Sequence, residues 1–105
     1  MNLIDHLRRQ FKFSAATFGP PPQGATVHGV LDHSRKEIAE IEASPNDLEE
    51  WIDGAMLAFD GAYRSGHTPE QIAAALEAKQ TKNEGRAWPD WRTHDPDKGV
   101  EHIRG

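Results

Sequence analysis

Hydrophobic residues recur every three or four positions along most of this chain, a spacing that places them on one face of an α-helix. The pattern predicts a first helix over residues 2 to about 13, which could extend to residue 16. The Gly- and Pro-rich segment 19–24 ends it. A second helix should begin within residues 25–33 and end near residue 43, on the apolar positions Val30, Ile38 and Ile41.

Two start signals place the later helices. Ser44–Asp47 reads as an N-cap followed by a proline at the first helical position and an acid in the first turn. The third helix should therefore cover 45 to about 65, and its several apolar sides predict a central place. Thr68–Gln71 has capping-box spacing, so a fourth helix should follow to about residue 82. The link between the second and third helices is short, which favours antiparallel neighbours.

No stretch alternates with the period of a β-strand, so an all-α bundle is predicted. The whole chain, 1–105, is expected to form one domain. Within it, 1–18 is the N-terminal helical segment and 85–105 is a tail rich in Trp and Arg. The tail should be an ordered loop with one last turn near Val100–Ile103.

Composition narrows the functional classes. The chain has no cysteine, which removes disulfides and thiolate metal sites. No run approaches the ~20 apolar residues that span a bilayer, and the net charge of −5 argues against a general nucleic-acid binder. A cytoplasmic, soluble protein is therefore expected. Hydrophobic residues make up only 36%, and a core this lean favours oligomerisation.

Two pairs of carboxylates carry the candidate chemistry: Glu37 with Glu40, and Glu50 with Asp53. Residues three apart point to the same side of a helix, so facing helices would bring four carboxylates together. Such a cluster needs a cation, and oxygen ligands suit Mg²⁺ or Mn²⁺. The alternative is that these acids are solvated helix faces, as most Asp and Glu are.

A group of donors lies at the end of the fourth predicted helix: Lys79, Lys82, Asn83 and Arg86. The negative end of the helix dipole explains the two lysines without any ligand. It does not explain Asn83 and Arg86, and the group as a whole has the donors that bind a polyphosphate.

Several segments together resemble one protein family. They are Phe13-Ser14-x-x-Thr17-Phe18-Gly19-Pro20, Gly29-Val30-x-x-His33-x-x-Lys36-Glu37, Asp47-Leu48-x-Glu50-Trp51-Ile52-Asp53 and Trp88-Pro89-Asp90-Trp91-Arg92. With the acid pairs and the basic group, they resemble the MazG-like all-α nucleoside triphosphate pyrophosphohydrolases. The closer likeness is to the small phage and bacterial dATP/dGTP diphosphohydrolase branch.

The resemblance implies a MazG-like bundle of four to five helices that hydrolyses dGTP or dATP to the monophosphate and pyrophosphate with Mg²⁺ or Mn²⁺. By position, Glu37, Glu40, Glu50 and Asp53 match the metal ligands and catalytic acids. Lys79, Lys82, Asn83 and Arg86 match the phosphate-binding motif. Family members form dimers or tetramers with sites at subunit interfaces. The chain departs from the broad pattern at Lys36, where the family has a second acid, and in a shorter segment between the acid pairs.

Other residues are left with two interpretations. Phe18 and Trp88 are candidates for stacking on a purine base, or they seal the core or a subunit interface. Asp60 lies on the face of Asp53 and either approaches the site or faces solvent, the latter being favoured. His33 is expected to be structural, because hard cations prefer oxygen.

The predicted mechanism is metal-assisted attack by water at the α–β linkage, with a carboxylate as base. The alternative functions are hydrolysis of other or modified nucleotides, and a non-catalytic helical interaction protein.

Overall fold

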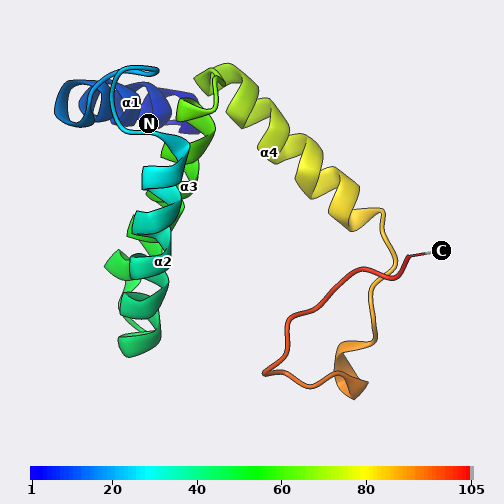
Figure 1. The fold of residues 1–105 in the computed structure, drawn as a ribbon. Helices are drawn as coiled ribbons and strands as arrows, with labels where there is room; N and C mark the ends of the chain where they lie inside the picture. Colours follow the sequence, from blue (N-terminus) through cyan, green and yellow to red (C-terminus); the bar gives the residue numbers. More distant parts are fainter. Residues whose placement is uncertain (105) are drawn as a thin grey trace. The chain divides into compact units, whose positions relative to one another are not determined.

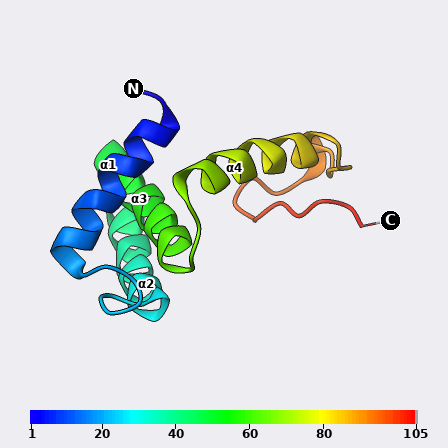
Figure 2. The ribbon, with the colours of Figure 1, turned by 90° about the horizontal axis from the view of Figure 1, so that it is seen from above.

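The structure is a computed structural model that describes residues 1–104; Gly105, the last residue of the predicted tail, lies outside the described residues. Four α-helices follow one another along the chain, and the only extended pairing within 1–104 is an isolated bridge between Ala87 and Ile103. The predicted all-α class is confirmed. The helices are α1 (Leu3–Phe18), α2 (Val27–Ala43), α3 (Leu48–Arg64) and α4 (Pro69–Glu84), and a 3-10 turn η1 covers Trp91–Thr93 (Figures 1 and 2).

The first compact unit covers residues 1–73. Within it α2 and α3 lie side by side and run antiparallel, as the short link predicts, while α1 packs on α3 (Figures 1 and 2). The buried apolar cluster contains Leu7, Phe11 and Ile72. Phe11 also stacks on Tyr63 of α3, with ring centroids 4.5 Å apart. The central place predicted for the third helix is confirmed, because α3 contacts both other helices.

The first helix is longer than predicted and ends at Phe18. Gly19 follows with a φ of 87°, a conformation that other residues adopt only with strain. The segment 19–24 then folds back on itself, because the Ala25 amide donates to the Phe18 carbonyl at 2.9 Å. A Cβ on Gly24 would lie 2.3 Å from the Gly19 carbonyl, so this closure requires glycine.

The predicted start of the third helix is wrong. Ser44 does not cap α3; its amide donates to the Glu40 and Ile41 carbonyls and so closes α2. Asp47 caps α3 instead, accepting a hydrogen bond from the Glu49 amide at 3.0 Å. The capping box between Thr68 and Gln71 is confirmed, with both reciprocal hydrogen bonds present.

The second compact unit contains the rest of α4 and the tail, residues 74–104. The Trp88 indole donates to the Asn83 carbonyl at 2.8 Å, and its ring meets His102 edge to face. The last helical turn lies at η1 rather than near Val100–Ile103, where the prediction is wrong. Asp90 sets this position, because its carboxylate accepts from the Arg92 amide. Within residues 1–104 no helix is both long and apolar enough to cross a membrane.

Candidate metal centre

Three of the predicted acids meet between α2 and α3. Glu37 faces α3 and is buried, Glu40 is exposed one turn later, and Glu50 in the first turn of α3 is half-buried. Carboxylate oxygens of the three lie within 4.8 Å of one another. We call Glu37, Glu40 and Glu50 the acid centre. The i, i+3 spacing and the short link between the helices produce it, as the sequence predicts.

The electrostatics of the acid centre are unfavourable without a cation. The pKa of Glu37 is raised from 4.5 to about 8, first by the Glu50 carboxyl, with which it can share a proton, then by burial and by Glu40. Glu37 Oε1 and Glu50 Oε2 are buried and have no hydrogen-bond partner within residues 1–104. Buried polar atoms are normally paired, and a hard divalent cation is the partner that two or three such oxygens fit.

The fourth predicted ligand, Asp53, is exposed and lies outside the 4.8 Å group. It lines a cavity of about 440 Å³ together with Glu37 and Glu40. We call this the acid-walled cavity. Asp53 therefore lies on the wall of the space that adjoins the acid centre.

Aromatic side chains form another part of the same wall. Phe13 and Phe18 line the acid-walled cavity and meet edge to face, with ring centroids 6.1 Å apart. Phe18 is 53% exposed, so its ring is available to a ligand. His33 also lines the cavity, and its ring is exposed.

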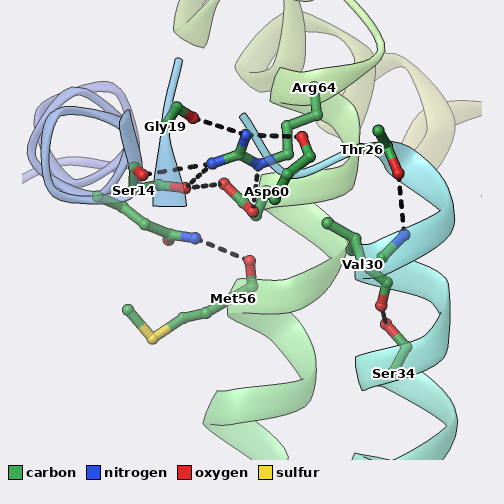
Figure 3. Close-up of polar contacts among 11 residues, drawn as sticks. Ser14, Gly19, Thr26, Val30, Ser34, Met56, Asp60 and Arg64 are labelled. Carbon is green, nitrogen blue, oxygen red and sulfur yellow. Dashed lines mark hydrogen bonds and ion pairs between the residues drawn. The ribbon is translucent and has the colours of Figure 1, made fainter. Parts of the chain in front are cut away.

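Asp60 does not face solvent, and that expectation is wrong. Its side chain is only 13% exposed and pairs with Arg64 at 2.9 Å, while its other oxygen accepts from Ser14 Oγ at 2.6 Å. Arg64 and Ser14 are both buried (Figure 3). Sequence reasoning missed this role of Arg64, although the i, i+4 spacing of Asp60 and Arg64 is a signal for the pair.

The predicted phosphate-binding residues belong to the second unit. Lys79 and Lys82 are exposed on α4. Asn83 and Arg86 come together, because Arg86 Nη1 donates to Asn83 Oδ1 at 3.2 Å. Trp88 joins them through its hydrogen bond to the Asn83 carbonyl. These contacts order the C-terminal end of α4 and leave the two lysines free of ion pairs within residues 1–104.

Comparisons with known proteins identify a family and a similar fold. The family described as dATP/dGTP pyrophosphohydrolase has a sequence model that matches residues 6–104. A solved structure of a cyanophage S-2L MazG-like pyrophosphohydrolase is similar, with 26% identity, 94% of each chain covered and a TM-score of 0.70. That protein is bound to dGDP and three catalytic Mn²⁺ ions per active site. No curated protein sequence matches the chain.

Proposed function

Because the chain belongs to the dATP/dGTP pyrophosphohydrolase family, we propose that it cleaves dGTP or dATP to the monophosphate and pyrophosphate. The protein is an enzyme that hydrolyses deoxynucleoside triphosphates with a divalent metal ion. The observation that carries the proposal is the acid centre. Its buried oxygens have no hydrogen-bond partner among the described residues, and it lies beside a cavity with an aromatic wall.

Glu37, Glu40 and Glu50 are the residues that would hold Mg²⁺ or Mn²⁺, with Asp53 contributing from the cavity wall. The similar phage enzyme binds Mn²⁺, which supports this assignment. A divalent cation supplies Lewis-acid chemistry there, polarising phosphoryl oxygens and acidifying water. Glu37 is protonated at neutral pH in the metal-free centre, because its pKa is about 8. It must release that proton before it can act as a ligand.

The reaction itself needs one base and one set of donors. A carboxylate of the acid centre, or that of Asp53, accepts a proton from the water that attacks phosphorus at the α–β linkage. The bond to the bridging oxygen then breaks, and pyrophosphate leaves. Lys79, Lys82, Asn83 and Arg86 are proposed to bind the phosphates, since their donors offset the developing negative charge.

The nucleoside is proposed to lie against the aromatic wall. Phe18 offers an exposed ring in the acid-walled cavity. Stacking on such a ring stabilises a bound base, whichever base it is. Trp88 remains a second candidate for stacking. Its indole N–H already bonds Asn83, so only its ring face is free for a base.

We also propose that the protein is a homodimer or homotetramer in the cytoplasm. An apolar groove of about 450 Å³ runs along α2 and α3. Leu31 and Ile38 in this groove are 46% and 55% exposed. Light scattering would give the number of subunits, and substitution of Ile38 by Asp should lower that number.

The decisive test is product analysis with dGTP, dATP, pyrimidine and modified nucleotides in the presence of Mn²⁺. The expected products are dGMP or dAMP with pyrophosphate. Release of orthophosphate alone would overturn the cleavage position, and preference for a modified or pyrimidine nucleotide would overturn the purine assignment. A protein that binds no nucleotide with Mn²⁺ would instead be a non-catalytic interaction protein.

A further inference from the structure

Arg64 uses every hydrogen-bond donor it has inside the protein. A guanidinium carries five N–H groups, and five hydrogen bonds leave this one (Figure 3). They reach Asp60 Oδ2, the carbonyls of Gly19 and Ala25, and the carbonyl and hydroxyl of Ser14. We call Arg64 with these four residues the Arg64 cluster. Its side chain is only 1% exposed, so Arg64 is not available to bind phosphate.

Three of the four residues that accept from Arg64 form part of the wall of the acid-walled cavity. Ser14, Ala25 and Asp60 all line that cavity, and Gly19 directly follows Phe18, which lines it too. Arg64 does not line the cavity itself. It therefore touches the cavity only through the residues it holds.

The bonds to Gly19 and Ala25 have a specific consequence for the segment between them. Both carbonyls bind the same nitrogen, Nη1, at 2.9 and 2.8 Å. One planar group thus holds the two ends of the 19–25 turn together and fixes them to α3. Phe18 immediately precedes this turn, and its carbonyl accepts from the Ala25 amide at 2.9 Å, so the backbone of Phe18 is tied to the same contacts.

We propose that Arg64 is a positioning residue for substrate binding: it fixes the Phe18 side of the acid-walled cavity, where the nucleoside lies. This rests on the proposed function. The acid centre is built by α2 and α3 and contains no partner of Arg64. Arg64 consequently governs affinity for the nucleotide rather than the chemical step.

The test is Arg64→Lys, which keeps the charge but offers donors from a single nitrogen and cannot serve all four residues. With Mn²⁺ and dGTP, KM should rise about tenfold, the ratio that roughly 1.4 kcal/mol of binding produces. The kcat should stay within about twofold, and Mn²⁺ affinity of the free protein should be unchanged. Hydrogen exchange at the amides of Gly24 and Ala25 should accelerate, a readout that does not depend on activity.

Ile72→Val is the matched control, because it weakens the apolar cluster of the same unit without touching the Arg64 cluster. It should lower Tm but leave KM and exchange in 19–25 as in the wild type. If Arg64→Lys lowers Tm in the same way, with KM or turn exchange unchanged, Arg64 is merely structural and the proposal is overturned. A fall in kcat at constant KM overturns it as well.

Should Arg64→Lys fail to fold, Ser14→Ala removes the hydroxyl that accepts from Arg64 and donates to Asp60, and it should raise KM about fivefold, as expected for two lost hydrogen bonds. An unchanged KM in that variant overturns the proposal. Failure of the proposed function is distinguishable, because the wild-type chain would then hydrolyse no dGTP. That result removes the positioning role together with the function.

Discussion

The first and last turns of α3 hold buried charge under opposite conditions. Near the start, Glu50 faces Glu37, and each has a buried oxygen that finds no hydrogen-bond partner in the part of the chain that the structure describes. Near the end, Arg64 pairs with Asp60 and finds an acceptor for every N–H group. One helix thus carries an incomplete polar cluster at Glu50 and a complete one at Arg64, about four turns apart.

The incomplete cluster should govern the chemical step, whereas the complete one should govern the stability of the fold and the shape of the substrate cavity. Removal of one partner from a satisfied buried ion pair is costly to the fold, because the other charge is left buried without compensation. An unsatisfied cluster of like charges gains its missing partner only from a ligand. Substitutions at the two ends of α3 should therefore affect different properties, and this can be measured.

The largest effect is expected for Arg64→Met. It leaves the Asp60 carboxylate in a site where it is only 13% exposed and has lost its cation. Breaking a buried pair in this way costs about 3–5 kcal/mol of unfolding free energy. Urea unfolding of the metal-free protein measures it. Arg9→Met, at an exposed position of α1, is the control and should change stability by less than about 0.5 kcal/mol.

Glu50→Gln should have the reverse profile. Loss of a metal ligand should lower kcat/KM at least about 100-fold, or roughly 2.7 kcal/mol of transition-state stabilisation. The stability of the metal-free protein should stay the same or increase, because the amide removes a negative charge beside Glu40 and makes ionisation of Glu37 less unfavourable. Glu42→Gln, at an exposed position of α2, should retain activity. A Glu50→Gln protein that is unstable but active would contradict the comparison.

The incomplete cluster was predictable from sequence and the complete one was not. Glu37 and Glu40 carry their own signal, a three-residue spacing on one helix, and the short link brings Glu50 of the next helix to them. Asp53, which the same spacing predicted, lies outside the group. The carbonyls that bind Arg64 belong to residues 39 to 50 positions away in the chain. Any residue has a carbonyl, so these contacts leave no trace in the sequence pattern.

The helices were predicted more reliably than their ends. Apolar positions located α1, α2 and α3, because burying one face stabilises a helix in a protein, whereas the capping box of Thr68 and Gln71 located α4. The start of α3 was predicted wrongly because Ser44 and Asp47 are both good capping residues. Ser44 instead ends α2, where its amide donates to the Glu40 and Ile41 carbonyls. The end of α1 depended on how far the Gly19 turn lets the helix continue.

The pH dependence of metal binding gives a third, smaller effect on the incomplete cluster. The folded-state pKa of Glu37, about 8, exceeds its ordinary value of 4.5. This group therefore favours folding of the metal-free protein below about pH 4.5, and that contribution is lost as pH rises through about 8. Mn²⁺ must displace the proton, so its affinity should increase from about pH 6 to about pH 8.

Calorimetry in two buffers of different ionisation enthalpy would count the proton released when Mn²⁺ binds. Glu37→Gln cannot release it, so that variant should bind Mn²⁺ more weakly and with little dependence on pH. An unchanged pH dependence in the variant would show that the proton resides on another group.

The smallest effect is expected for a neutral hydrogen bond between α1 and α3. It tests whether the buried charge of the complete cluster, rather than any contact between these helices, sets the cost of unfolding. Gln10 is buried and donates to the Met56 carbonyl at 2.7 Å, one turn from the contact between Ser14 and Asp60. Gln10→Met replaces this neutral tie with a side chain of similar size and should cost about 1 kcal/mol in urea unfolding. A cost equal to that of Arg64→Met would mean that α1 docking as a whole, and not a satisfied buried charge, sets the stability of this end of α3.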